Sequence, residues 1–239
     1  MSINKVFDSF DQAVGDVFDG AVIFMGGFGP ANGTPSNLIR ALVKQGAKNL
    51  TLVANTAGYG RQKPGEPPFR KTPPHYDDGG LLIQNGQVKK VICAFAGLFR
   101  TGPNALVFDR FAAGELEVQM IPQGTLAERM RAAKAGISAF YVPTGAGTVI
   151  EEGKETRYFE GRKNVMEFPL KADFALVRAH KADRYGNLVY QGTSRNFNPV
   201  MAGAASVTIA EVDMVVPLGD LDPEAVVTPS IYVDRVVSR

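Results

Sequence analysis

The chain reads Val22-Ile23-Phe24-Met25-Gly26-Gly27-Phe28-Gly29-Pro30-Ala31-Asn32-Gly33-Thr34-Pro35, an apolar run that ends abruptly in glycines. The apolar part is typical of a buried strand. Beyond the glycines, an apolar stripe at helical spacing begins at Leu38 and stops at Gly46. Thr34 is expected at the N-cap of this helix and Pro35 at its first position. The stretch therefore predicts a strand, a glycine loop and a helix in direct succession.

The glycine loop has two interpretations. Glycine lets the backbone turn tightly and approach a ligand closely, and free N–H groups at a helix start favour an anion such as a phosphate or an oxyanion. The competing interpretation is a strand-to-helix turn that needs glycine only for positive φ, because glycine-rich motifs are weakly specific. The residues of the loop alone do not separate the two.

The whole chain has 239 residues, which suffice for one α/β domain, and we expect a single domain over residues 1–239. Its 26 basic and 24 acidic residues nearly balance, which favours a small anionic ligand over nucleic acid. Cys93 is the only cysteine, so neither an intrachain disulfide nor a cysteine zinc site is possible. The two histidines, His75 and His180, are too few to suggest a metal site.

The pattern of apolar residues predicts an open, mostly parallel sheet with helices on both faces, because strand and helix signals alternate over the first 150 residues. From residue 155 the pattern changes to short alternating strands, so the C-terminal half is expected to be partly antiparallel. No targeting segment and no stretch as long as a membrane span occurs, which predicts a cytoplasmic chain with no membrane partner.

Polar residues after the second strand suggest part of a ligand site. Asn55 follows the apolar run of residues 49–54, and open α/β sheets place ligand loops beyond the carboxyl ends of their strands. Asn55 is therefore a candidate side-chain donor. An asparagine that only satisfies a turn is the competing interpretation.

Five blocks of the sequence, spread nearly from end to end, stand out together. The blocks are Gly26-Gly27-Phe28-Gly29 with Gly33 and Pro35, Pro122-Gln123-Gly124-Thr125-Leu126-Ala127-Glu128-Arg129, Pro143-Thr144-Gly145-Ala146-Gly147-Thr148, Ala172-Asp173-Phe174-Ala175-Leu176-Val177, and Arg195-Asn196-Phe197-Asn198-Pro199. In this order they resemble the A (alpha) subunit of family I CoA-transferases of the 3-oxoacid and 3-oxoadipate type.

The resemblance implies transfer of CoA from an acyl-CoA donor such as succinyl-CoA to a 3-oxo acid, through a glutamate that carries CoA as a thioester. That glutamate belongs to a Ser-Glu-Asn-Gly block of a separate B (beta) subunit, and no such block occurs here. No catalytic residue is therefore expected in this chain, and coenzyme A enters as a substrate with no tightly bound cofactor. An A2B2 assembly and a large apolar face toward B are implied. Ordinary solvated carboxylates are expected at Glu115, Glu117, Glu128, Glu151, Glu152, Glu155, Glu160 and Glu167.

The resemblance also implies the site residues. The loop expected to bind CoA or an oxyanion comprises Gly26, Gly27, Phe28, Gly29, Pro30, Ala31, Asn32 and Gly33. The substrate cleft is expected to include Asn55, Gln123 and Gly124. Thr125 and Glu128 stand at capping-box spacing, so we expect them to cap a helix instead.

Two departures from the family pattern stand out. The family tends to show two asparagines where this chain has Asn55 followed by Thr56. The proline-rich, basic segment of residues 61–75 is longer than the family's usual connection, and it is expected to be a lid, a subunit contact, a mobile loop or a solvated basic loop.

Two other functions stay open. A CoA-ester hydrolase or a ring-cleaving enzyme can use the same scaffold, because a fold does not fix a reaction. A non-catalytic ligand-sensing module is the second. Esterase, NTPase and thiol-redox functions lack their minimum motifs in this sequence.

Overall fold

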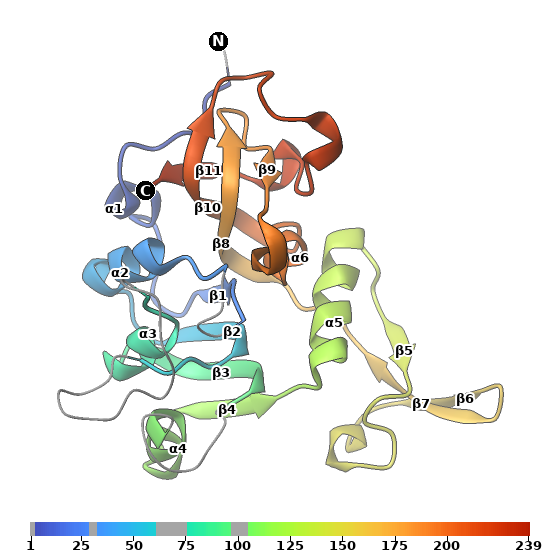
Figure 1. The fold of residues 1–239 in the computed structure, drawn as a ribbon. Helices are drawn as coiled ribbons and strands as arrows, with labels where there is room; N and C mark the ends of the chain where they lie inside the picture. The colour runs from blue at the N-terminus through green and yellow to red at the C-terminus, as the bar shows by residue number, and fades with distance from the viewer. Residues whose placement is uncertain (1–2, 29–32, 61–75, 97–104) are drawn as a thin grey trace.

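A computed structural model describes residues 3–28, 33–60, 76–96 and 105–239. Its centre is a sheet in the order β11-β10-β8-β1-β2-β3-β4, with β9 pairing beside β8 (Figure 1). The strands of this sheet are β1 (Val22–Met25), β2 (Leu50–Thr56), β3 (Val88–Phe95), β4 (Glu117–Met120), β8 (Ala172–Asp183), β9 (Leu188–Val189), β10 (Ala205–Val216) and β11 (Arg235–Ser238).

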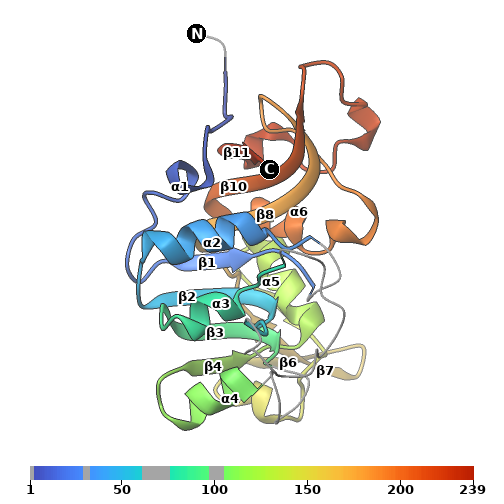
Figure 2. The same cartoon turned by 60° about the vertical axis from the view of Figure 1, so that its left-hand side comes forward.

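Helices cover both faces of the sheet, as the sequence predicts (Figures 1 and 2). The helices are α1 (Phe10–Ala13), α2 (Ser36–Gln45), α3 (Gly80–Gln84), α4 (Ala105–Ala112), α5 (Gln123–Ala135) and α6 (Asn198–Ala202). The first four pack on one face and the last two on the other. None of the helices in these described ranges combines the length and apolar character needed to cross a bilayer.

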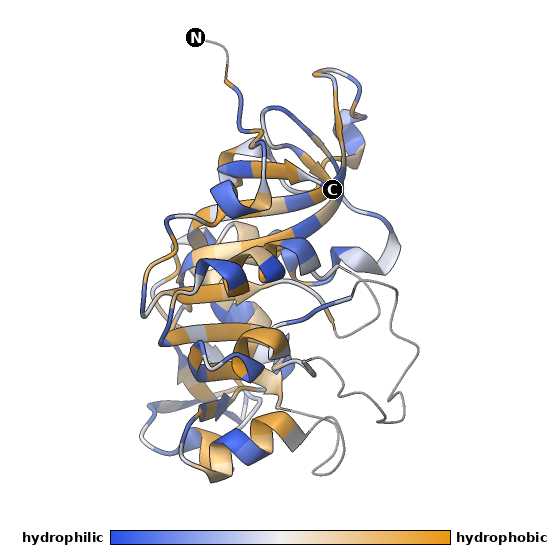
Figure 3. Cartoon of the chain, turned by 90° about the vertical axis from the view of Figure 1, so that its left-hand side faces the viewer, coloured by the Kyte–Doolittle hydropathy of each residue, from blue (hydrophilic) through white to orange (hydrophobic). Residues whose placement is uncertain are grey.

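Strand alternation divides the core into two layers. Ile23 and Met25 of β1 point into the layer under α1 to α4, whereas Phe24 points into the layer under α5 and α6. Each of these three side chains is buried. The strands are accordingly orange in Figure 3, while hydrophilic residues lie on the outer sides of the helices. A sheet covered on both faces is the usual environment of parallel strands.

The C-terminal half is partly antiparallel, as the sequence predicts. Strands β8, β10 and β11 continue the parallel sheet, and β9 pairs antiparallel with β8. A separate antiparallel sheet has the order β5-β7-β6, from β5 (Phe140–Val142), β6 (Thr156–Phe159) and β7 (Arg162–Glu167). This small sheet forms an arm that projects from the main body beyond α5 (Figure 1).

Both predicted helix N-caps are wrong, although α2 ends at Gly46 as predicted. α2 begins at Ser36, and its N-cap residue, Pro35, offers no side-chain cap, so Thr34 does not cap it. α5 begins at Gln123, two residues before the expected cap, and Thr125 lies inside its first turn. Its Oγ1 is buried and makes no hydrogen bond within the described ranges. The starts of α2 and α5 are therefore not set by these local capping signals, whereas Ser9 caps α1 by accepting the Gln12 N–H at 3.2 Å.

Candidate functional site

The predicted site residues converge on the carboxyl edge of the sheet. Gly26 follows β1, Asn55 is the last residue but one of β2, and Gln123 comes shortly after β4. These strands are parallel, so their carboxyl ends meet at one edge, where open α/β sheets bind ligands.

Two asparagines from a distant segment hold the glycine loop in place. The Gly27 N–H points at Oδ1 of Asn196 at 3.4 Å, and Nδ2 of Asn198 donates to the Gly33 carbonyl at 3.1 Å. Oδ1 of Asn198 accepts the Arg178 N–H of β8 at 3.1 Å. Asn198 is completely buried. The two asparagines therefore tie both described ends of the loop to each other and to the sheet.

The glycines at the ends of this loop are required by the packing of the protein itself. An added Cβ at Gly26 would lie 1.9 Å from Oδ1 of Asn198, and one at Gly27 would lie 2.1 Å from Oγ1 of Thr34. Gly27 and Gly33 also have positive φ, at 107° and 80°. The interpretation that glycine is needed for positive φ is therefore correct for Gly27 and Gly33. At Gly26, Gly27 and Gly33 the atoms that would clash with a Cβ belong to the protein itself. Gly29, Pro30, Ala31 and Asn32 lie outside the described residues.

Backbone strain marks the segment that holds the loop. Asn196 has φ 27° and ψ −126°, outside the allowed regions for most side chains. Its neighbour Phe197 packs edge-on against Phe28 of the loop, with ring centroids 4.7 Å apart. Such strain persists only where surrounding contacts enforce it, and it concentrates at functional sites. Sequence reasoning assigned these asparagines no role, and the available signal was asparagine's tolerance of positive φ.

The start of α2 is not free to bind an anion, contrary to expectation. Glu211 of β10 accepts the N–H groups of Asn37 and Leu38 through Oε2, at 2.8 and 3.2 Å. Its Oε1 accepts Nε of Arg239 at 2.7 Å. Glu211 is completely buried. A protein carboxylate thus occupies the anion site at this helix start, and N–H donors for a ligand must come from the glycine loop.

Asn55 and Gln123 are in direct contact. Nε2 of Gln123 donates to Oδ1 of Asn55 at 2.6 Å, and Nδ2 of Asn55 lies 3.3 Å from Oγ1 of Thr56. Asn55 is buried, whereas Gln123 and Gly124 are exposed in the first turn of α5. The structure therefore brings the predicted amide pair together beside the glycine loop; its role toward a substrate stays a prediction.

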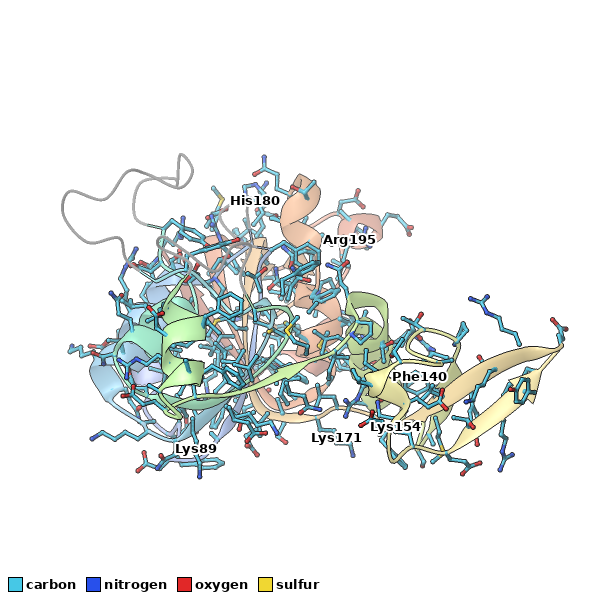
Figure 4. The ribbon with its side chains drawn as sticks, turned by 90° about the horizontal axis from the view of Figure 1, so that it is seen from below. Lys89, Phe140, Lys154, Lys171, His180 and Arg195 are labelled. Carbon is cyan, nitrogen blue, oxygen red and sulfur yellow. The ribbon has the colours of Figure 1, made fainter. Side chains whose placement is uncertain are left out.

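One expected surface glutamate is buried. Glu167, at the end of β7, bonds Lys154 through Oε1 at 2.6 Å, and its Oε2 lies 3.9 Å from Nε of Arg129. The two cations compensate the buried charge. Glu167 therefore joins the arm to α5 and is not a solvated residue. Figure 4 shows Lys154 and Phe140 on this arm, far from His180 and Arg195.

A buried aspartate anchors both ends of residues 61–75, a segment that itself lies outside the described residues. Asp78 accepts the N–H groups of Tyr59, Gly60 and Gly80 at 3.0 to 3.1 Å. The Tyr76 hydroxyl donates to it at 3.1 Å. Burial raises the pKa of Asp78, and the N–H donors counteract that shift. The carboxylate therefore holds together the residues on either side of this segment, Tyr59 and Gly60 before it and Tyr76 after it.

The sequence matches the family model described as "Coenzyme A transferase" over residues 7–239. The chain belongs to the coenzyme A transferase family. It is 48% identical to the A subunit of the 3-oxoadipate CoA-transferase of Pseudomonas putida, an alignment that covers 99% of this chain and 94% of that one. It is 44% identical to the A subunit of the probable succinyl-CoA:3-ketoacid coenzyme A transferase of Bacillus subtilis, over 98% of this chain and 90% of that one.

Solved structures share this fold. An acyl-CoA transferase from E. coli O157:H7, in a thioester complex with CoA, superposes with a TM-score of 0.81 at 22% identity. The match covers 99% of this CoA-transferase chain and 47% of that one, so the chain spans about half of that protein. The decarboxylase AibA/AibB, as a variant with one cysteine replaced by serine, gives a TM-score of 0.74 at 25% identity over 99% of this chain and 84% of that one.

Proposed function

We propose that this chain is the A subunit of a heteromeric CoA-transferase that moves CoA from an acyl-CoA donor such as succinyl-CoA to a 3-oxo acid. The observation that carries the proposal is the glycine loop at the carboxyl edge, braced by Asn196 and Asn198. The names of the relatives support the same activity, because this chain aligns with 94% of the Pseudomonas putida protein.

The nucleophilic glutamate is proposed to lie on a separate B subunit. The chain has no Ser-Glu-Asn-Gly block. The two glutamates buried in the described part of the chain are both engaged, Glu211 with the start of α2 and Glu167 with Lys154 and Arg129. A carboxylate held by such bonds is a poor nucleophile, because attack on a thioester requires breaking them first.

This chain is proposed to supply the polar half of the site. Backbone N–H groups of residues 26–33 are assigned to CoA or to the oxyanion that forms when the carboxylate attacks the thioester. The amides of Asn55 and Gln123, with Gly124 beside them, are assigned to the acid. Removing one preorganised donor of this kind typically costs about 2.7–4 kcal/mol of transition-state stabilisation. Coenzyme A itself enters as substrate, with no tightly bound cofactor.

Exposed apolar side chains at the same edge support a partner there. Phe95 and Met120, at the ends of β3 and β4, are 43% and 49% exposed. Large apolar side chains exposed together are typical of interaction sites. We assign this edge to the B subunit, which would bring its glutamate to the glycine loop, in an A2B2 assembly.

The decisive test compares the two purified subunits separately and combined. Each by itself should give no CoA transfer, and mixing should restore it, with one CoA equivalent trapped on a B-subunit glutamate. Light scattering of the co-expressed pair should report the mass of A2B2. Turnover by the isolated chain, with a glutamyl adduct trapped in it, would contradict the division of roles.

CoA-ester hydrolysis or decarboxylation is the second candidate, favoured by the similarity to a decarboxylase structure. Product analysis separates the three reactions in the reconstituted complex. Transfer yields new acyl-CoA and no free thiol, hydrolysis releases free CoA, and decarboxylation releases CO2. If free CoA or CO2 forms faster than new acyl-CoA, the complex is a hydrolase or a decarboxylase and the proposed transferase function is wrong.

A further inference from the structure

A polar cavity of about 260 Å³ lies next to the asparagines that brace the glycine loop. Arg178 and His180 of β8, Asp213 of β10 and the turn of residues 191–194 line it. Nδ2 of Asn198 donates to the Ser194 carbonyl at 2.9 Å, so the wall of the cavity is bonded to the brace. Figure 4 shows His180 and Arg195, the last residue of η4 (Gly192–Arg195), at the same end of the molecule.

The cavity exists because one edge of β8 is interrupted. β1 pairs with β8 as far as Leu176, and β9 pairs with β8 only from Lys181. Residues 177–180, which lie between these two pairings, therefore have no strand on that edge. The Arg178 N–H bonds the side chain of Asn198 instead, and residues 191–194 lie across the remaining gap.

Two basic side chains are held at the cavity by one carboxylate. Nη2 of Arg178 donates to Oδ1 of Asp213 at 2.9 Å, and Nδ1 of His180 lies 3.1 Å from Oδ2. Burial raises the pKa of Asp213, but the bonds from His180 and Arg178 outweigh burial and hold that pKa below its usual range. Arg178 has no other side-chain hydrogen bond to the described part of the chain, which leaves Nε and Nη1 for a ligand.

The size and position of the cavity restrict its ligand. At about 260 Å³ it is smaller than sites for drug-sized molecules, so a nucleotide does not fit and a short acid does. Arg178 lies two residues beyond Leu176, whose carbonyl accepts the Gly26 N–H at 2.9 Å. Two strand residues span roughly 6.6 Å. A six-carbon acid has five bonds between its terminal carbons and spans about 6 Å when extended, since three backbone bonds span about 3.8 Å.

We infer that this cavity binds the second carboxylate of a dicarboxylic acyl group, with Arg178 as the cation that recognises it. The inference rests on the proposed transferase function and specifies its substrate class. The first carboxyl carbon reacts at the glycine loop while the far carboxylate accepts a hydrogen bond from Nη1 of Arg178. Asp213 orients the guanidinium, and Gln191 and Thr193 offer polar atoms around it.

The test compares 3-oxoadipate with 3-oxohexanoate, which differ only in the second carboxylate, as acceptors for the reconstituted A–B complex. In a two-step transfer, kcat/KM for the acceptor depends only on the second step, in which the acceptor takes CoA from the enzyme. With succinyl-CoA at saturating concentration as the donor for both acids, the first step therefore does not affect the comparison. The wild type should prefer 3-oxoadipate. Arg178→Met should lower kcat/KM for 3-oxoadipate roughly 10- to 100-fold, the worth of one charge-assisted hydrogen bond, and leave 3-oxohexanoate within about twofold.

Controls separate a local effect from misfolding. Lys181→Met removes one positive charge from the opposite face of the same strand and should leave kcat/KM for both acids unchanged. Arg178→Lys should keep part of the preference, and Thr193→Phe, which fills the cavity without touching the charge, should also lower the preference. A wild type without preference for 3-oxoadipate, or an Arg178→Met effect equal for both acids, overturns the inference. Absence of transfer to either acid by the wild type refutes the proposed function instead.

Discussion

Glu211 on β10 bonds the backbone N–H of Asn37 at the start of α2, and 174 residues separate the two along the chain. The same carboxylate accepts the side chains of Asn37 and Arg239. One buried residue near the C-terminus thus fixes the helix that follows the glycine loop and the C-terminal residue of the chain.

Replacing Glu211 should destabilise the protein severely. Glu211→Ala leaves two helix N–H groups without an acceptor and removes the nearer of the two carboxylates beside Arg239, and each buried donor left unsatisfied costs about 1–3 kcal/mol. Glu211→Gln keeps one acceptor oxygen and should lose less. Urea unfolding of both variants measures this order. The exposed Glu224→Gln control should stay within about 0.5 kcal/mol of wild type, and a similarly small change in Glu211→Ala would show that the cap is dispensable.

A methyl group at either glycine that follows β1 should abolish most activity. Gly26→Ala and Gly27→Ala place Cβ within about 2 Å of Asn198 and Thr34, so the loop must move to relieve the overlap. We expect kcat of the reconstituted complex to fall at least 100-fold, about the effect of losing one oxyanion donor, with assembly retained. Gly15→Ala, whose Cβ makes only ordinary contacts, is the matched control. Wild-type kcat in both loop variants would reduce the loop to a simple turn.

Removing the Asp78 carboxylate should destabilise the protein. Asp78→Ala leaves the N–H groups of Tyr59, Gly60 and Gly80 without their acceptor, and a buried donor left unsatisfied costs about 1–3 kcal/mol. Thermal unfolding should show the loss, and proteolysis should cut residues 61–75 faster than in the wild type. Unchanged stability would mean that water or a shifted backbone satisfies these groups. Asp109→Ala, on the exposed side of α4, serves as the control.

Cys93 should be chemically inert in the folded chain. Burial raises the pKa of its thiol to about 12, so at pH 8 roughly one molecule in 10,000 carries the reactive thiolate. Because the folded pKa is raised, reactivity should increase as pH rises toward it. Ellman's reagent should label almost no native protein at pH 8 and one thiol per chain in guanidinium. Rapid native labelling would show that the core around β3 opens.

The convergence of the site could be predicted from the sequence, because it follows from local patterns and one topological rule. Gly26 and Asn55 each end a buried strand, and parallel strands bring such ends together. The bonds from Asn196 and Asn198 to the glycine loop, and the capping of α2 by Glu211, could not be predicted. Asn198 contacts Gly33 across 165 residues, and Glu211 replaces the local cap that Thr34 seemed to offer. Such contacts leave no periodic or spacing signal within either segment.

The late position of the brace has a consequence for synthesis on the ribosome. Gly27 and Gly33 are made early, but their partners Asn196 and Asn198 emerge only after β8. A nascent chain that stops before residue 196 lacks both asparagines that hold the described ends of its glycine loop. Incomplete translation products therefore cannot display a finished site, and any coenzyme A binding by this loop must begin after nearly the whole chain has been translated.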